Sequence, residues 1–225
     1  MSLWTKYQLL RAFFFIAKYL LASPSQVMQI QSATFEISSP DLEGCPESAL
    51  REFAFIGRSN VGKSSLINML TGKKDLAVVS SKPGRTRLIN FFTINRNWSL
   101  VDLPGYGYAK ASGQERNKWH EFVSDYLVNR ENLSCVFVLI DSRLKPQRID
   151  LLFTEWLVGC GVPFVLVFTK ADKTKHNAMT INMEAFMSAM EEFCEGLPRC
   201  FTCSSKTSLG RKELLDFVGQ ALAVT

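Results

Sequence analysis

GRSNVGKS, at residues 57–64, is the stretch of sequence that decides the fold. It follows the apolar run EFAFI at 52–56 and opens a predicted helix, the setting of a P-loop, G-x-x-x-x-G-K-S. Gly57 and Gly62 let the backbone turn tightly, so that successive N–H groups can point at phosphate oxygens. Lys63 would bridge the β- and γ-phosphates, and the Ser64 hydroxyl would coordinate Mg²⁺. The motif therefore predicts a site for a nucleoside phosphate.

A second apolar strand ends in the sequence DLPG, which starts at Asp102. We expect Asp102 to hold Mg²⁺ through a water molecule and the N–H of Gly105 to contact the γ-phosphate. Between the two motifs, PGRTR at 83–87 offers Thr86 as a second hydroxyl ligand of the metal ion. Thr86 and Gly105 would lose a partner when the γ-phosphate leaves, so both loops could relax. This arrangement predicts a nucleotide-dependent switch.

The sequence TKAD at 169–172 follows another apolar strand and predicts which base is bound. An ionised Asp172 only accepts hydrogen bonds, so it suits the two N–H groups on one edge of guanine but would face a lone pair on adenine. The stem of Lys170 can cover the base, and Thr169 stands where many GTPases have Asn. In the later CSS sequence, a backbone N–H near Ser205 would reach the guanine oxygen. The predicted ligand is therefore GTP or GDP.

Two positions bear on the rate of hydrolysis. Tyr106 follows DLPG directly, where many GTPases have a glutamine that orients the attacking water, and a phenol has no such amide geometry. We therefore expect slow intrinsic turnover. Asn60, the fourth P-loop residue, either binds a K⁺ ion that acts in place of an arginine finger or only braces the loop.

Apolar runs alternate with amphipathic stretches from residue 28 onward, which is typical of βα units. The predicted fold class is α/β: a mostly parallel central sheet with one antiparallel hairpin partner strand and helices on both faces, in three layers. We expect strands at 29–37, 51–56, 88–94, 98–102, 135–141, 163–169 and 199–203. We expect helices at 63–71, 113–129, 146–159, 178–194 and 209–222.

The composition predicts one domain, residues 28–225, in a cytoplasmic and monomeric protein. Of the 225 residues, 47% are apolar and 21% charged, which is ordinary for a globular chain. The six cysteines have no regular spacing, so we expect reduced thiols. Cys200 and Cys203 form a C-x-x-C within a predicted strand, and we interpret them as a buried structural pair, with no metal site there.

Residues 1–27 differ from the rest because they form an apolar extension interrupted by Arg11 and Lys18. The run is too short and too charged to span a bilayer. Four interpretations stay open: an upstream start site before Met28, an interfacial helix, a helix packed on the domain, and a cleaved targeting peptide. The interfacial helix motivates the alternative function, a membrane-associated GTPase, which liposome flotation would test.

The net charge of +5 is concentrated in one segment. Residues 57–118 carry eleven Lys or Arg against three Asp or Glu, whereas the rest of the chain is slightly acidic. Part of this excess offsets nucleotide phosphates, and phosphate compensation alone is one interpretation. The other is a polyanion partner beside the switch loops. No module that reads DNA sequence and no RRM or KH pattern is present in the sequence.

The motifs together resemble one family. GRSNVGKSSLIN at 57–68, PGRTRLINFF at 83–92, VDLPGYGYAK at 101–110, IDSRLKPQRIDLLFTEWL at 140–157 and TKAD at 169–172 closely resemble the EngB (YsxC/YihA) family of bacterial GTPases, over about residues 29 to 222. The resemblance implies a TRAFAC-type P-loop GTPase fold and a role in assembly of the large ribosomal subunit, with a link to normal division and septation. Tyr106 and Thr169 are typical of that family.

On this basis the basic segment has a candidate partner, ribosomal RNA. The residues expected to contact RNA come from Lys73, Lys74, Lys82, Arg85, Arg87, Lys110, Arg116 and Lys118. The residues expected to contribute to catalysis are Lys63, Thr86, Gly105 and Asn60. The expected metal ligands are Ser64, Thr86 and, through water, Asp102. Those expected to contact the nucleotide are Gly57, Arg58, Ser59, Asn60, Val61, Gly62, Lys63, Ser64, Gly84, Arg85, Thr86, Arg87, Leu88, Asp102, Leu103, Pro104, Gly105, Thr169, Lys170, Ala171, Asp172, Cys203, Ser204 and Ser205.

One rival class shares the P-loop. A metabolic P-loop kinase would use the same cradle, but it needs an acceptor pocket and has no use for TKAD. Chromatography of the product separates the two, because hydrolysis yields free phosphate and a kinase yields a new phosphorylated compound.

Overall fold

The computed structural model describes residues 28–77, 88–107 and 113–223, without the side chains of 113–120. The predicted N-terminal extension lies outside these ranges, as do Gly84, Arg85, Thr86 and Arg87. The described residues divide into two compact units, one formed by those of Ile30–Leu139 and the other by Met28, Gln29 and the residues from Ile140 to Ala223. The prediction of a single domain over residues 28–225 stays a prediction. In the described part of the chain, no helix is long and apolar enough to cross a membrane.

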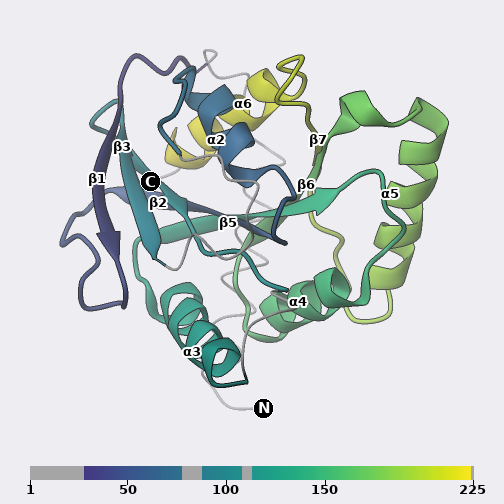
Figure 1. Ribbon diagram of the computed structural model, residues 1–225, viewed down its shortest axis with the longest axis horizontal. Helices are drawn as coiled ribbons and strands as arrows, with labels where there is room; N and C mark the ends of the chain where they lie inside the picture. The colour runs from purple at the N-terminus through teal and green to yellow at the C-terminus, as the bar shows by residue number, and fades with distance from the viewer. Residues whose placement is uncertain (1–27, 78–87, 108–112, 224–225) are drawn as a thin grey trace. The chain divides into compact units, whose positions relative to one another are not determined.

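The unit Ile30–Leu139 contains most of the sheet (Figure 1). Its elements are β1 (Ala33–Ser39), β2 (Arg51–Gly57), α2 (Lys63–Thr71), β3 (Ile89–Ile94), β4 (Trp98–Asp102), α3 (Gly113–Asn129) and β5 (Leu133–Asp141), whose last two residues enter the other unit. Within this unit α2 and α3 lie on opposite faces of the strands. Strands β2, β4 and β5 are buried along almost their whole length, which is why they read as unbroken apolar runs.

The second unit supplies the remaining elements. They are α4 (Arg148–Gly159), β6 (Phe164–Thr169), the 3₁₀ helix η1 (Ala171–Lys173), α5 (His176–Met190), β7 (Cys200–Thr202) and α6 (Arg211–Ala223). Strands β6 and β7 are parallel, and α4 packs beside α5.

The strand order of the seven-stranded sheet is β1-β3-β4-β2-β5-β6-β7. Strand β2 is parallel to both β4 and β5, whereas β3 is antiparallel to both of its neighbours, β1 and β4. Strand β3 therefore runs against the others in its part of the sheet. The predicted α/β class, with a mostly parallel sheet and one antiparallel hairpin partner, is confirmed.

The hairpin between β3 and β4 forms where the sequence predicts it. Asn95 and Arg96 both have positive φ, at 51° and 56°, and the N–H of Asn97 donates to the carbonyl of Ile94 at 2.9 Å. Ile94 pairs with Trp98, so the loop has three residues, Asn95 to Asn97, and two of them take the left-handed conformation, which Asn tolerates.

Two element boundaries differ from the prediction for a visible reason. β1 begins at Ala33, not at residue 29, because the N–H groups of Gln31 and Ser32 donate to the side chain of Asn95, at 2.7 and 3.0 Å, before the strand ladder starts. Helix α5 ends at Met190, and the residues up to 194 continue as turns. Helix ends commonly fray in this way.

The cysteines are free thiols. Burial raises the pKa of Cys200 to about 11 and that of Cys203 to about 12. Both thiols are therefore protonated at neutral pH, and of the predicted buried pair Cys203 is buried whereas Cys200 is half-buried.

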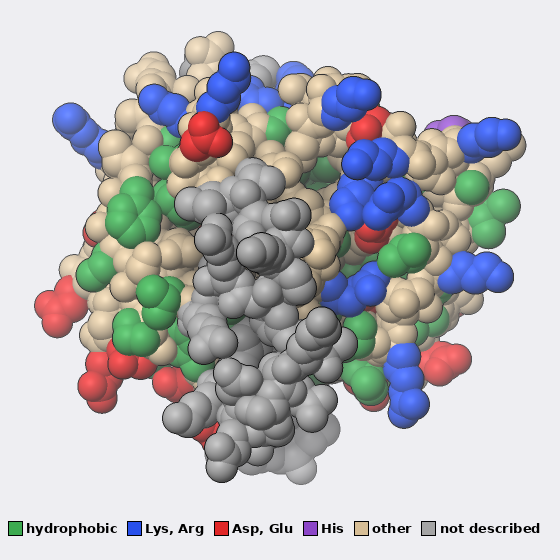
Figure 2. All heavy atoms as spheres, in the orientation of Figure 1, with side chains coloured by type: hydrophobic (Ala, Val, Ile, Leu, Met, Phe, Trp, Pro, Cys, Tyr) green, Lys and Arg blue, Asp and Glu red, His purple; other side chains and the backbone are tan. Residues whose placement is uncertain are grey.

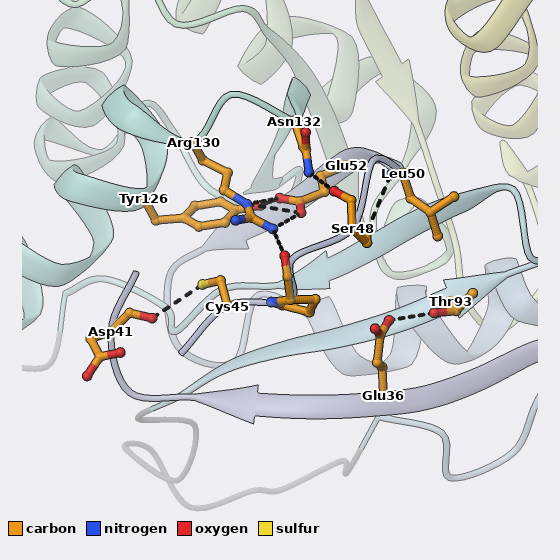
Figure 3. A network of polar contacts seen from close by, with 11 residues as sticks. Glu36, Asp41, Cys45, Ser48, Leu50, Glu52, Thr93, Tyr126, Arg130 and Asn132 are labelled. Carbon is orange, nitrogen blue, oxygen red and sulfur yellow. Dashed lines mark hydrogen bonds and ion pairs between the residues drawn. The ribbon is translucent and has the colours of Figure 1, made fainter. Parts of the chain in front are cut away.

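A buried ion pair joins the start of β2 to the end of α3 (Figure 3). The Glu52 carboxylate, 1% exposed, accepts a hydrogen bond from the Tyr126 hydroxyl at 2.7 Å and from Arg130 Nη2 at 2.6 Å. The same Arg130 nitrogen donates to the carbonyl of Pro46 at 2.7 Å. Burial and the neighbouring carboxylate raise the pKa of Tyr126, so the phenol stays a donor. The network fixes the C-terminal end of α3 to the sheet.

Candidate nucleotide-binding site

The P-loop joins β2 to α2 as the motif predicts. Gly57 is the last residue of β2 and Lys63 is the first of α2. Asn60 and Gly62 are both left-handed, with φ of 64° and 106°, and they turn the chain back to the helix start. The first intrahelical hydrogen bond runs from the N–H of Leu66 to the carbonyl of Gly62 at 2.9 Å. The N–H groups of the preceding helical residues are thus placed to bind an anion, as at other helix N-termini.

Gly57 has no room for a side chain. A Cβ at this position would lie 2.7 Å from the carbonyl oxygen of Leu139 and 2.9 Å from Cγ1 of Val61. The first of these contacts is with backbone, which cannot rotate away. The P-loop therefore starts at a position where only glycine fits.

The DLPG loop lies directly against the P-loop because β2 and β4 pair in parallel. Past the end of that ladder, the N–H of Leu103 donates to the carbonyl of Phe55 at 3.0 Å, and the N–H of Tyr106 donates to that of Gly57 at 3.2 Å. A Cβ on Gly105 would lie 2.7 Å from the Gly57 carbonyl oxygen. The close approach of two backbones thus requires glycine in both motifs.

Lys63 and Asp102, taken from the two motifs, form an ion pair. Asp102 is 3% exposed. The hydroxyl of Ser59, between Gly57 and Lys63, is buried without a hydrogen-bond partner among the described residues. A phosphate oxygen in the cradle would give that hydroxyl an acceptor.

The donor set suits magnesium and a nucleotide. Ser64 offers a hydroxyl and Asp102 a carboxylate, both oxygen ligands of the kind that Mg²⁺ prefers. Among the described residues no group of three or more His, Cys, Asp or Glu side chains could hold a metal ion alone. That is expected for Mg²⁺ bound mainly through phosphates and water. Thr86, the third predicted ligand, lies outside the described residues, and Leu88, the last residue predicted to contact the nucleotide from that loop, is 38% exposed.

The residues predicted to recognise the base belong to the other unit. Asp172 lies in η1, and its Oδ1 accepts a hydrogen bond from the Ser204 hydroxyl at 2.7 Å. This bond is the main cause that lowers the pKa of Asp172. The N–H of Ala171 donates to the carbonyl of Cys203 at 3.1 Å. The two predicted base motifs, TKAD and CSS, are therefore connected through side chain and backbone, and Asp172 is held ionised.

The CSS loop uses part of its hydrogen-bonding capacity within the protein. The N–H of Cys203 donates to Phe168 and that of Ser204 to Leu209, at 2.8 and 3.1 Å. Gly210 closes the loop with a φ of 78°, and a Cβ there would lie 2.2 Å from the Thr202 carbonyl oxygen. The assignment of Cys203 and Ser204 to direct nucleotide contact stays a prediction.

Two charged residues beside the TKAD turn, Asp141 and Arg143, are not among the predicted site residues. Asp141, the last residue of β5, accepts hydrogen bonds from Lys170 and from Arg143. The signal that identifies Asp141 is its position, because an aspartate at the carboxyl end of a buried strand of a parallel sheet lies where ligands of such folds bind.

Comparison with known proteins identifies a family of GTPases. The model of a family described as "50S ribosome-binding GTPase" matches residues 52–170. A probable GTP-binding protein EngB from Bacteroides fragilis is 51% identical over 191 residues, which are 85% of this chain and 95% of that protein. A probable GTP-binding protein EngB from Porphyromonas gingivalis is 52% identical over the same coverage.

Solved structures agree on the fold. A crystal structure of a probable GTP-binding protein EngB aligns with a TM-score of 0.62 at 23% identity, covering 76% of this chain and 98% of that one. Era in complex with MgGDPNP and nucleotides 1506–1542 of 16S ribosomal RNA aligns with a TM-score of 0.60 at 22% identity, covering 75% of this chain and 55% of that one.

The fold and the two sets of motifs define a P-loop GTPase. With half of its aligned residues identical to those relatives over nearly their full length, the chain belongs to the EngB family within that class.

The close packing at Gly57 gives a testable prediction. Gly57→Ala should lower the free energy of unfolding by about 2 kcal/mol, because the new methyl group overpacks a site bounded by backbone. Urea unfolding measures this. The control is Gly159→Ala, where a Cβ has nothing within 4 Å, so stability should stay the same or rise slightly. Equal stability of Gly57→Ala and the wild type would contradict the packing described.

Proposed function

We propose that this protein is a GTP-binding switch that hydrolyses GTP to GDP and phosphate with Mg²⁺. The single observation that carries the proposal is the ionised Asp172, whose Oδ1 accepts a hydrogen bond from Ser204. The carboxylate has capacity left to accept both N–H groups on one edge of guanine, and it would meet a lone pair on adenine. The P-loop supplies the complementary phosphate site.

In this proposal each phosphate group has a defined set of partners. The backbone N–H groups from Gly57 to Ser64 would bind the β-phosphate. The N–H of Gly105 would donate a hydrogen bond to the γ-phosphate, so this contact would be lost after hydrolysis. Ser64, Thr86 and, through water, Asp102 would hold Mg²⁺, and the ion would supply positive charge beside the phosphate oxygens.

Lys63 has to change partners when the nucleotide binds. Its ammonium pairs with Asp102, and the same ammonium is the group that would bridge the β- and γ-phosphates. We infer that Lys63 exchanges this carboxylate for phosphate oxygens, which frees Asp102 for the water bound to Mg²⁺. One exchange of ion-pair partners would thus couple phosphate binding to metal binding.

Slow intrinsic turnover is part of the proposal. Tyr106 is 3% exposed and its N–H donates to the Gly57 carbonyl, so its phenol is packed in the protein and does not serve as a water-orienting amide. Asn60 is exposed at the turn of the P-loop. A K⁺ ion held near Asn60 would add positive charge where an arginine finger acts in other GTPases.

Phosphate release tests the proposed chemistry. The wild type should release phosphate from GTP at a rate on the order of 10⁻³ s⁻¹, and Ser64→Ala should lower that rate at least about ten-fold by removing a metal ligand. A titration of KCl against NaCl tests the ion. Stimulation by K⁺ that is lost in Asn60→Ala supports the K⁺ role, whereas equal rates in both salts, unchanged in Asn60→Ala, would refute it.

We further propose that the switch acts in the cytoplasm, as a monomer, in assembly of the large ribosomal subunit, with effects on division and septation. Two observations support this. The matching family is described as 50S ribosome-binding, and residues 57–118 carry eleven Lys or Arg against three Asp or Glu. Of the predicted RNA-contacting residues, Lys73 and Lys74 are exposed just after α2.

Sedimentation with purified ribosomal subunits tests this partner. In moderate salt the GTP-bound form should pellet with large subunits at least several-fold more than the GDP-bound form, and the difference should shrink as salt rises, because phosphate contacts weaken steeply with salt. Lys73→Glu should reduce binding, while Lys212→Glu, the same change of charge at an exposed lysine of α6, serves as the control for charge alone. Equal pelleting of both nucleotide forms would contradict the proposal.

A further inference from the structure

Asp141 binds two cations at the carboxyl end of β5. Its Oδ2 accepts a hydrogen bond from Lys170 Nζ at 2.8 Å. Arg143 binds the same carboxylate with two groups, Nε to Oδ1 at 2.9 Å and Nη2 to Oδ2 at 2.8 Å. Asp141 is 5% exposed, so this is a nearly buried ion pair with a fixed geometry. Because the Asp141 carboxylate has a fixed position, it can also fix the position of a side chain that binds to it.

The backbone beside Asp141 is bonded to the start of TKAD as well. The Thr169 hydroxyl donates to the carbonyl of Ile140 at 3.2 Å, and the N–H of Ser142 donates to the carbonyl of Thr169 at 3.1 Å. Three consecutive residues at the end of β5 therefore bind the two that lead into η1. Thr169 uses its hydroxyl for this contact, so it does not supply the wider hydrogen bonding of an Asn at that position.

The backbone conformation of Lys170 has to be stabilised by its surroundings. Its φ is 62°, a left-handed conformation that a lysine adopts only at a cost in energy. It also precedes η1, the helical turn that carries Asp172, and its carbonyl accepts the N–H of Lys173 at 2.9 Å. The position of Lys170 therefore fixes both its own side chain and the start of the turn that presents Asp172.

The charge of Asp141 is secure at neutral pH. Burial opposes its ionisation, but the hydrogen bonds from Arg143 and Lys170 outweigh burial and hold the pKa of this carboxyl well below its usual range. The carboxylate is therefore a permanent acceptor for Lys170.

We propose that Asp141 is a positioning residue for guanine recognition: it holds the Lys170 side chain so that the aliphatic stem covers the base. The inference rests on the proposed binding of guanine nucleotides. Asp141 touches no nucleotide itself and acts through Lys170. In a chain with Thr at position 169, this ion pair replaces rigidity that an Asn would give to the same loop.

A double-mutant cycle on GDP affinity tests the proposal. Asp141→Asn keeps the shape of the side chain but removes the charge, and Lys170→Met keeps an apolar stem but removes the ammonium. Asp141→Asn alone should weaken GDP binding about ten-fold, a coupling typical of side chains in contact, mainly through faster dissociation. In the Lys170→Met background, the same change should alter GDP affinity less than about two-fold.

The matched control is Glu52→Gln, which removes the charge of another buried carboxylate paired with an arginine, at the opposite end of β2 from the P-loop. It should lower the melting temperature and leave GDP affinity within about two-fold. An equal effect of Asp141→Asn in both backgrounds, or lower stability with unchanged GDP affinity, would overturn the proposal. If the wild type itself fails to bind GDP, the proposed function fails first, so the two failures are distinguishable.

Discussion

The parallel pairing of β2 with β4 is the constraint on which the phosphate side of the site depends. Phe55 lies opposite Asp102 in this ladder, and after β4 has ended the N–H groups of Leu103 and Tyr106 still donate to carbonyls of β2. Two loops that are far apart in the sequence are thereby held backbone to backbone. Glycine is required at 57 and 105 because there is no room for Cβ atoms between them and their neighbours. The ion pair between Lys63 and Asp102 is a consequence of that pairing.

Hydrogen bonds hold the TKAD turn, which is predicted to bind the base, in place. Ser204 holds Asp172, Cys203 accepts from Ala171, and Asp141 holds Lys170, so each residue of the TKAD turn has a partner outside it. Polar groups in such a network are oriented before the ligand arrives. Orientation in advance lowers the entropy that binding has to overcome, which is the general benefit of preorganisation.

Much of the fold and of the candidate site could be predicted from the sequence, because the local sequence preferences agree with the structure that the chain adopts. The P-loop helix has the predicted boundaries, 63–71, since glycine, lysine and serine at fixed spacing leave the backbone few alternatives. The Asn95-Arg96 turn was predictable because it separates two apolar strands and begins with Asn, which tolerates the left-handed conformation. The early end of α5 was not, because the apolar spacing continues through residue 194 while the helix does not. Asp141 was not predicted because its contact with Lys170 joins residues 29 positions apart, and no local motif contains both.

The central claim, that Asp172 selects guanine, is tested most directly by Asp172→Asn and a comparison of GTP with XTP. The asparagine oxygen can keep the hydrogen bond from Ser204, which leaves its NH₂ group to donate to the xanthine carbonyl that replaces the guanine amino group. The account predicts that GTP affinity falls about a hundred-fold or more, while XTP affinity rises towards that of the wild type for GTP. A loss of GTP binding with no gain for XTP would contradict it.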